Sequence, residues 1–431
     1  MRMTARVLAR DVLMRCERQR QYSNLALDAA LKRSDLSDAD RALATALVYG
    51  VLERRLTLDY QIEGLSEREP ERIDLETLTA LRLGIYQMAY LSRVPDHAAV
   101  NEAVAMVGKR SAGFVNALLR AFGRRNKKLF YPDRGEGEAR YLSVRYSVGL
   151  PLCERFLRTF GAERTESILG AIEGQTPLTV RVNPLKTDRE TMLNALAGEG
   201  YAAEPCECVP YGIRITSNAP VAALPGFSEG WFFVQDEASQ ICVEAVDVRP
   251  DMTVLDTCAC PGSKSFGMAM NMKNRGTLLS CDLHASKLSL ITASAERLGI
   301  RIIRTMERDA RAACEEWSEN GGTFDRVLCD VPCSGFGVLA KKPELRYKDP
   351  HESDGLPAIQ LDILNRSASF LKTGGRLVYS TCTVLPEENE RNLQRFLGLH
   401  PEFTRVSERT YYPDTDGTDG FFVAVLEKTE K

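Results

Sequence analysis

The chain carries the stretch TVLDTCACPGSKS at residues 253–265, in which a short apolar run, Thr253–Cys258, leads into a loop with one proline and one glycine. From here to the C-terminus, strand-like and helix-like segments alternate. Five further strands are expected, at Thr277–Asp282, Ile302–Met306, Arg326–Asp330, Arg376–Ser380 and Phe421–Leu426, and the helices between them include Ala285–Leu298 and Ile359–Leu371. The alternation predicts an α/β domain with a doubly wound sheet and right-handed crossovers.

The loop after the first strand differs from the two common phosphate-binding loops. A Walker A loop has glycine directly before its lysine and again five residues earlier, but these positions hold Ser263 and Cys258. A dinucleotide-binding fingerprint has three glycines, whereas residues 256–265 contain only Gly262. The loop therefore indicates a ligand that carries less phosphate than ATP or NAD.

Acidic residues follow the next strands of the predicted sheet. Asp282 ends the second strand, where such folds bind ribose hydroxyls, and Asp309 follows the third, where a carboxylate could accept from an adenine amino group. With the tight loop, these acids favour S-adenosylmethionine, which has no phosphate and a positive sulfonium. A single Asp in such a place is as often a helix cap or turn residue. Three at successive strand ends, Asp330 being the third, favour a ligand site.

Two cysteines lie in similar settings after two later strands. Cys333 belongs to DVPCSG at residues 330–335 and Cys382 to YSTCT at residues 379–383. Because the carboxyl ends of parallel strands open onto one crevice, both thiols are expected at one site. A thiolate is well suited to add to an electron-poor pyrimidine ring. The alternative is that both are small buried hydrophobic residues, as most free cysteines are, but the Pro-Cys-Ser-Gly and Ser-Thr-Cys-Thr contexts favour catalysis.

The first 130 residues have a different pattern and a different charge. Apolar residues recur at helical spacing through residues 4–127, and Ser37 with Asp40 is typical of a helix N-cap. Residues 1–130 hold 22 Lys and Arg against 16 Asp and Glu, a net charge of +6, whereas the rest of the chain carries −9. We expect an all-α bundle that binds a polyanion, the alternative being a solvated surface with an accidental excess of charge.

Between this bundle and the predicted sheet the pattern is mixed. A helix near residues 152–160 is followed by a strand at Leu178–Asn183, a helix near 189–197 and a strand at Gly212–Ile215. Small α/β units of this kind often contact RNA. We therefore expect three domains, at residues 1–130, 131–230 and 231–431.

The composition narrows the class of protein. At 431 residues, with 44% hydrophobic and 27% charged, the chain is expected to be a soluble multidomain protein. No apolar run has the length of a membrane span, and arginines interrupt the N-terminal region, so a cytoplasmic location is expected. Twelve cysteines without regular spacing indicate reduced thiols. The Cys206-x-Cys208 and Cys258-x-Cys260 spacings differ from those of zinc knuckles, so no metal is expected.

These features together resemble the Sun/Fmu (RsmB-type) family of bacterial RNA cytosine methyltransferases over nearly the full length of the chain. The resemblance rests on residues 81–87 and 114–120 in the helical front, 181–183 and 234–240 ahead of the sheet, and 324–337, 374–389 and 419–422 within it. It implies a NusB-like helical RNA-binding domain, a small α/β subdomain and a Rossmann-like methyltransferase domain. The implied reaction is S-adenosylmethionine-dependent formation of 5-methylcytidine in small-subunit (16S) ribosomal RNA.

The resemblance also implies roles for individual residues. Cys382 would be the nucleophile that adds to carbon 6 of cytosine, Cys333 would assist product release, and Asp330 would lie between cofactor and base. Asp282 would hold the cofactor's ribose and Asp309 its adenine. The methionine part would be enclosed by Cys258, Ala259, Cys260, Pro261, Gly262, Ser263 and Lys264. The usual loop is Ala-Pro-Gly-Gly-Lys, from which Cys260 and Ser263 depart. Ser263 puts a Cβ where the backbone usually approaches the cofactor, so it is expected to bear on cofactor affinity rather than on reaction type.

Other functions remain as alternatives. The same chemistry could act on transfer RNA or at another ribosomal site. A non-catalytic, NusB-like RNA-binding factor with a relic methyltransferase fold is the alternative from another class, and the presence of both cysteines and all three acids argues against it. A nicotinamide-dependent oxidoreductase is excluded by the missing glycines. The expected partner is ribosomal RNA, with no membrane, and the protein is expected to be a monomer.

Overall fold

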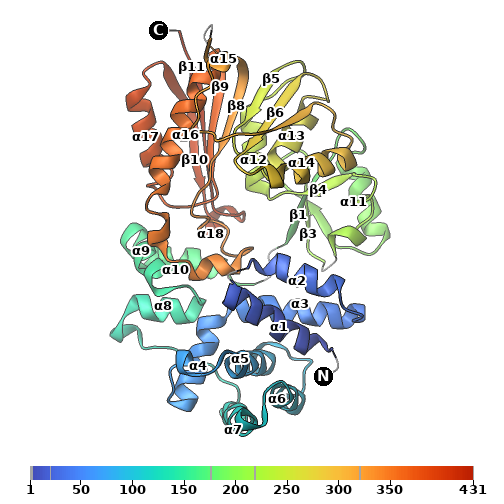
Figure 1. Ribbon diagram of the computed structural model, residues 1–431, viewed down its shortest axis with the longest axis vertical. Coiled ribbons are helices and arrows are strands. Elements are labelled where there is room, and N and C mark those ends of the chain that lie inside the picture. Colours follow the sequence, from blue (N-terminus) through green and yellow to red (C-terminus); the bar gives the residue numbers. More distant parts are fainter. Residues whose placement is uncertain (1–2, 20, 175–176, 218–219, 320–321, 431) are drawn as a thin grey trace. The chain divides into compact units, whose positions relative to one another are not determined.

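The computed structural model describes residues 3–19, 21–174, 177–217, 220–319 and 322–430. The chain divides into two compact units, residues 1–173 with 342–350, and residues 174–341 with 351–431. Figure 1 shows the first as helices in blue and green and the second as sheets with helices around them. The all-α bundle, the small sheet subdomain and the Rossmann-like domain expected from the sequence are confirmed. The three domain bounds stay a prediction.

The first unit is a bundle of amphipathic helices. The Ser37 hydroxyl accepts the Asp40 N–H at 3.2 Å, so the expected N-cap is confirmed. Arg82 on α5 (Leu75–Tyr90) is buried and donates to Asp59 and Glu17, each at 2.7 Å. The helices are α1 (Ala5–Gln19), α2 (Ser23–Lys32), α3 (Asp38–Glu53), α4 (Arg55–Ser66), α5 (Leu75–Tyr90), α6 (Asp96–Ala105), α7 (Lys109–Arg124), α8 (Glu138–Tyr146), α9 (Leu150–Phe160) and α10 (Ala162–Ala171).

A short segment from far along the chain completes this bundle. Residues 342–350, which follow the loop of Cys333, contain the short helix η5 (Pro343–Tyr347). The guanidinium of Arg346 is buried and donates to the backbone carbonyls of Glu53, at 2.9 Å, and Ile172, at 3.1 Å. The sequence that follows Cys333 is therefore anchored in the helical unit before it returns to the second unit.

The second unit begins with a small antiparallel sheet of order β2-β3-β1-β4, packed on one helix. Arg181 on β1 is buried and bonds Glu244 at 2.7 Å, and Asn183 donates to the carbonyls of Gly230 and Leu298. The Arg-Val-Asn motif therefore joins the small sheet to the domain behind it. The elements are β1 (Leu178–Val182), α11 (Arg189–Gly198), β2 (Ala203–Pro205), β3 (Gly212–Ile215) and β4 (Phe232–Val234).

The large sheet has seven strands in the order β10-β11-β9-β8-β5-β6-β7, of which β5 to β9 are parallel. Its strands are β5 (Thr253–Asp256), β6 (Thr277–Asp282), β7 (Ile303–Glu307), β8 (Phe324–Asp330), β9 (Leu371–Thr381), β10 (Phe403–Tyr411) and β11 (Phe421–Lys428). The helices are α12 (Glu237–Val246), α13 (Ser263–Asn271), α14 (Ala285–Leu298), α15 (Glu315–Ser318), α16 (Leu356–Phe370), α17 (Glu390–Leu399) and α18 (Pro413–Asp416).

Successive residues of each central strand face opposite layers of helices. Leu328 and Val378 belong to the core shared with α12, α13 and α14, whereas Cys329 and Tyr379 belong to the core shared with α16 and α17. Figure 1 shows helices on both faces of this sheet. The doubly wound arrangement is confirmed, with corrections. The first strand ends at Asp256 rather than Cys258, and β10 was not expected. The helix expected at Ile359–Leu371 is α16, which ends at Phe370, and the strand expected at Arg376–Ser380 is β9, which already begins at Leu371.

Candidate active site

The carboxyl ends of the parallel strands bring together the residues chosen from the sequence. Strand β8 lies beside both β5 and β9, with Asp330 paired in register with Ser380. The loop after β5 therefore meets the turn after β8 and the turn after β9 at the carboxyl end of the parallel strands, called this edge of the sheet below. Asp282 ends the next strand, β6, at the same edge.

The two cysteines face each other across this edge. The Sγ atoms of Cys333 and Cys382 are 3.2 Å apart, and the backbone N–H of Cys382 donates to the Cys333 sulfur at 3.3 Å. Both are free thiols. The hydrogen bond with Cys382, burial and the charge of Cys382 raise the pKa of Cys333 well above its usual value. The thiolate form of Cys333 is therefore disfavoured by its surroundings.

Lys264 connects the cofactor loop to this pair. Its Nζ donates to Asp330 Oδ2 at 2.7 Å, while Asp330 Oδ1 accepts from the Ser380 hydroxyl at 2.8 Å. Burial alone would lower the pKa of Lys264, but Asp330 raises it above its usual value, and Cys382 adds to that effect. The attraction between Lys264 and Cys382 is mutual, so the ammonium favours the thiolate form of Cys382.

The loop between β5 and α13 is a tight turn. The N–H of Ala259 donates to the carbonyl of Cys281 at 2.7 Å, and Gly262 has φ +109° at the start of α13. A Cβ at Gly262 would come within 2.6 Å of the Phe266 ring, so only glycine fits. The Cys260–Pro261 peptide bond is cis. Lys264 lies on the first turn of α13, and its side chain reaches Asp330.

The acids expected to hold the nucleoside differ in their surroundings. Asp282 accepts backbone N–H groups from Cys260, at 3.3 Å, and His284, at 3.0 Å, which places its carboxylate beside the cofactor loop. Asp309 accepts three hydrogen bonds from Arg311, one from its backbone N–H and two from its guanidinium. The hydrogen bonds from the Arg311 side chain are the largest cause that lowers the pKa of Asp309 to about 2. Asp282 and the Gly262 turn follow the adjacent strands β6 and β5, an arrangement that fits a nucleoside cofactor. The carboxylate of Asp309, by contrast, is already bonded to Arg311.

A buried acid that sequence reasoning missed lies beneath the same loop. Asp256, at the end of β5, is 1% exposed, and its Oδ2 accepts from the Ser265 hydroxyl at 2.6 Å. Burial raises the pKa of Asp256 to about 7. Within the described part of the chain, its Oδ1 has no hydrogen-bond partner. Asp256 ends the first strand, within the stretch 253–265, and this position was the one feature of the sequence from which its place at the site could have been predicted.

Three further residues missed by sequence reasoning surround the cysteine turns. Glu388, Gln360 and Thr383 are all buried and are hydrogen-bonded to the backbone or side chains of residues 332–334. Glu388 and Thr383 lie in a stretch, residues 374–389, that the sequence resemblance covered. Gln360 lies on α16 and carried no signal in the sequence.

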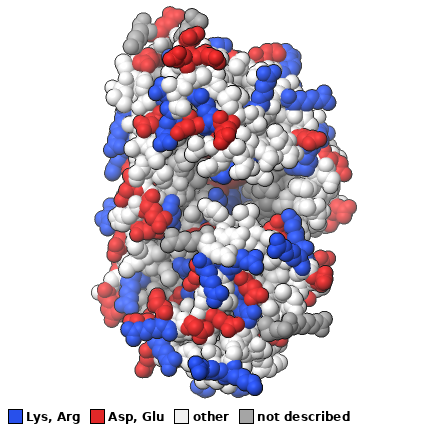
Figure 2. Space-filling view, in the orientation of Figure 1, with Lys and Arg blue, Asp and Glu red and all other residues white. Residues whose placement is uncertain are grey.

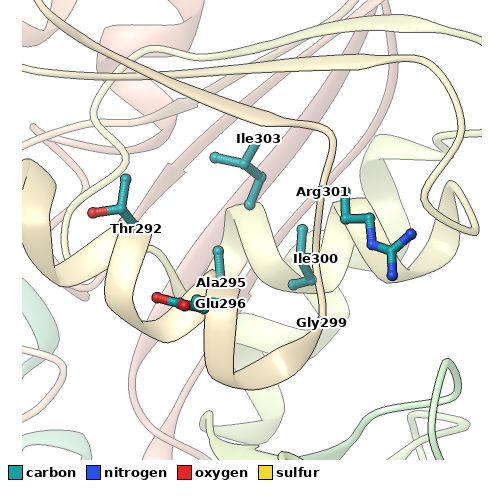
Figure 3. Close-up of a pocket in the computed structure, with 7 residues that line it drawn as sticks. All are labelled: Thr292, Ala295, Glu296, Gly299, Ile300, Arg301 and Ile303. Atoms are coloured by element: carbon teal, nitrogen blue, oxygen red, sulfur yellow. The ribbon is translucent and has the colours of Figure 1, made fainter.

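Other features of the structure lie away from this edge. The hollow in Figure 3 is lined by Thr292 and Glu296 on α14 and by Ile303, the first residue of β7. It therefore lies at the amino end of the parallel strands, opposite the cysteines. Among the described residues, no cluster of His, Cys, Asp and Glu has the arrangement of a metal site. No helix in the described ranges combines the length and apolar character needed to cross a membrane.

Comparison with known proteins identifies the family. The family model for the 16S rRNA methyltransferase RsmB/F matches residues 243–427, the NusB family model matches residues 3–124, and the ferredoxin-like domain of RsmF/B-like methyltransferases matches residues 152–222. The probable ribosomal RNA small subunit methyltransferase B of Bacillus subtilis is 37% identical, over 99% of each chain. The chain belongs to the 16S rRNA methyltransferase RsmB/F family.

Further relatives agree with this membership. The probable ribosomal RNA small subunit methyltransferase B of Synechocystis is 34% identical over 99% of each chain, and the ribosomal RNA small subunit methyltransferase B of Pectobacterium carotovorum is 32% identical over 95% of each. The crystal structure of PH0851 is similar over 99% of this chain and 100% of that chain, with a TM-score of 0.82 and 26% identity. The resemblance inferred from the sequence is therefore confirmed.

Proposed function

We propose that this protein transfers a methyl group from S-adenosylmethionine to carbon 5 of a cytosine in small-subunit ribosomal RNA, through a covalent bond between Cys382 and carbon 6. The observation that carries the proposal is the pair of thiols 3.2 Å apart beside the Lys264–Asp330 ion pair. Membership of the RsmB/F family and the names of its relatives support a methyltransferase that acts on 16S ribosomal RNA.

The chemistry requires a nucleophile because carbon 5 of cytosine is too weakly nucleophilic to take a methyl group unaided. Addition of the Cys382 thiolate to carbon 6 converts the ring into an enamine whose carbon 5 can attack. Lys264 favours the thiolate before addition. Asp330, held by Lys264 and Ser380, is placed to accept from the amino edge of the base and so to orient the ring for addition.

Cys333 has a separate role in this proposal. After methylation a proton must leave carbon 5 so that the Cys382–carbon 6 bond can break and aromaticity return. Cys333, beside Cys382, would accept that proton in its thiolate form, directly or through water, while the C5–H electron pair re-forms the 5,6 double bond and Cys382 leaves as a thiolate. The two thiols thus divide addition and release between them.

The methyl donor is an external cofactor. When bound, S-adenosylmethionine supplies an electrophilic methyl group. In this proposal the backbone of residues 258–263 lines its methionine part, while Asp282 accepts from the ribose hydroxyls. Arg311 already occupies the Asp309 carboxylate. Asp309 would therefore contact the adenine amino group only by accepting from Arg311 and the adenine together, or after its bonds with Arg311 had broken.

The helical unit is the proposed site of RNA binding. Helix α7 presents four exposed basic side chains, of Lys109, Arg110, Arg120 and Arg124. Figure 2 shows acidic and basic side chains intermixed over the face in view, with basic ones at its lower end. Cationic side chains along a helix bind nucleic-acid phosphates, and such contacts could supply the few kcal/mol needed to extrude the target base.

The proposal is tested by transfer of labelled methyl from S-adenosylmethionine to unmodified small-subunit ribosomal RNA and, in parallel, to bulk transfer RNA. The digested product is analysed for 5-methylcytidine. Label in ribosomal cytidine alone supports the proposal. Label only in transfer RNA would keep the chemistry and overturn the substrate, and no label in either would favour the non-catalytic RNA-binding alternative.

A further inference from the structure

A carboxylate lies buried behind the two cysteine turns. Glu388 is 1% exposed, in the segment that connects Cys382 to α17. Its Oε1 has no hydrogen-bond partner among the described residues, and Glu388 forms no ion pair in that part of the chain. An uncompensated buried charge is costly, so its presence beside reacting groups requires an explanation.

The other carboxylate oxygen holds the turn that carries Cys333. Glu388 Oε2 accepts the backbone N–H of Ser334 at 3.0 Å and the Nε2 of Gln360 at 2.8 Å. The same Gln360 amide donates to the carbonyl of Pro332 at 3.0 Å. Both neighbours of Cys333 in sequence are therefore held, directly or through Gln360, by one carboxylate.

The same network reaches the turn that carries Cys382. The Ser334 hydroxyl donates to Thr383 Oγ1 at 2.8 Å, and Asn389, next to Glu388, bonds both the hydroxyl of Thr381 and the carbonyl of Thr383. The residues on both sides of each cysteine are thus tied to one segment, Glu388–Asn389. The separation of the two sulfur atoms depends on this segment.

We propose that Glu388 is a positioning residue that clamps the Cys333 turn against Cys382 and places a carboxylate behind the Cys333 thiol. The two cysteines come from similar turns, so some other group must make them unequal. A negative charge behind one thiol disfavours its thiolate, and thus assigns nucleophilic attack to the other. This inference rests on the proposed function, because it explains how that reaction distinguishes its two cysteines.

The surroundings of Cys333 agree with this role. Its pKa is raised by the hydrogen bond with Cys382, by burial, by the charge of Cys382 and by Glu388. Tyr379 on β9 also interacts with Cys333 and is itself buried. The charged group on the other side of the pair is Lys264, whose ammonium acts on Cys382. Glu388 and Lys264 therefore act on different thiols and with opposite sign.

The experiment measures the reactivity of Cys333 in the full-length chain with and without this charge. Glu388→Gln keeps one oxygen that can accept from both donors and replaces the other oxygen, which has no partner among the described residues, with an uncharged NH2 group. In a Cys382→Ala background, the rate of alkylation of Cys333 by iodoacetamide is followed against pH by peptide mass spectrometry. Glu388→Gln should move the midpoint to lower pH by about one unit, the lower end of the effect expected from a nearby like charge.

Two matched variants separate charge from structure. Glu390, the first residue of α17, carries a carboxylate that accepts from the Thr410 hydroxyl rather than from the cysteine turns. Glu390→Gln should therefore leave the midpoint unchanged. Glu388→Asp keeps the charge and should keep the midpoint high. If Glu388→Gln fails to fold, Glu388→Met supplies an uncharged side chain of similar volume for the same measurement.

An unchanged midpoint in a folded Glu388→Gln or Glu388→Met protein would overturn the inference, as would an equal shift in Glu390→Gln. The alkylation measurement needs no RNA and no methyl transfer. Its outcome is therefore separate from that of the labelled-methyl assay, and either proposal can fail alone.

Discussion

Replacing Cys333 by alanine should separate bond formation from bond release. In the structure Cys333 makes two hydrogen bonds with Cys382, and only the one between the sulfur atoms, at 3.2 Å, involves the proposed nucleophile; the other, at 3.3 Å, comes from the Cys382 backbone N–H. Loss of one such bond costs about 0.5–1.5 kcal/mol, which would slow formation of the RNA adduct by about 2- to 12-fold. Loss of an acid–base group from the release step costs about 100- to 10,000-fold. The covalent RNA complex should therefore accumulate in Cys333→Ala.

The assay incubates enzyme, S-adenosylmethionine and end-labelled ribosomal RNA, and separates free from protein-bound RNA on denaturing gels. Cys333→Ala should give a stable shifted band with little turnover, whereas wild type should turn over with little shifted RNA. Cys260→Ala is the control, because it removes another half-buried thiol at the same edge and restores the usual loop residue. Normal turnover by Cys333→Ala without a shifted band would refute the division of roles, and so would a shifted band in Cys260→Ala.

Three further changes test other parts of the site. Asp330→Asn should lower turnover at least about 100-fold and reduce stability, because the half-buried Lys264 ammonium loses its charged partner. Turnover and unfolding are measured together. As pH rises from 4 to 8, the free energy of unfolding of Asp256→Asn should increase relative to that of wild type by a few kcal/mol. Denaturant titrations at each pH measure this difference. Arg120→Ala combined with Arg124→Ala should weaken RNA binding and reduce the salt dependence of log K by about 1.4–1.8, leaving turnover at saturating RNA unchanged.

The sign for Asp256 follows from its pKa, which burial raises from 3.8 to about 7 in the folded state. The folded protein then binds a proton that the unfolded chain has lost, so this group's stabilisation is present below pH 3.8 and is lost as pH rises through about 7. Both tryptophans, Trp231 and Trp317, lie in the second unit, so their fluorescence reports its unfolding. Parallel pH curves for variant and wild type would contradict the reasoning.

The other two changes also have outcomes that would count against them. Near-normal turnover by Asp330→Asn would show that the Asp330 carboxylate is not needed for the reaction. For the α7 variants, an unchanged salt dependence would show that Arg120 and Arg124 do not contact RNA phosphates. The matched control is Arg68→Ala, on the same helical unit, whose guanidinium lies over the Phe114 ring.

The parts of the fold that the sequence predicted are those with a strong local pattern. Strands β6 and β3 and helix α14 have the expected bounds, because an apolar run bounded by turn residues, or apolar residues at helical spacing, is sufficient to identify them. Strand β10 has none of these signals. It lies at the sheet edge, most of its residues are exposed, and it carries Arg405, Glu408 and Arg409, so tertiary pairing with β11 makes it a strand.

The candidate site divides in the same way. The proximity of Cys333 and Cys382 was predictable because each follows a parallel strand, and β8 and β9 prove to be neighbours. Glu388 and Gln360 were not predictable, because they come from a loop and a helix face that meet these turns only after the chain has packed. Arg311 likewise engages Asp309 through a local contact that strand-end reasoning did not consider.

The most direct test of the central claim is to trap the adduct and find the residue that bears it. A small-subunit ribosomal RNA fragment containing 5-fluorocytidine is incubated with enzyme and S-adenosylmethionine; because fluorine replaces the proton that must leave carbon 5, the covalent complex cannot resolve. After nuclease and protease digestion, mass spectrometry should place the methylated, fluorinated nucleotide on the peptide containing Cys382, and Cys382→Ala should give no complex. A nucleotide attached to Cys333, or no covalent complex with an RNA that the enzyme methylates, would contradict the account.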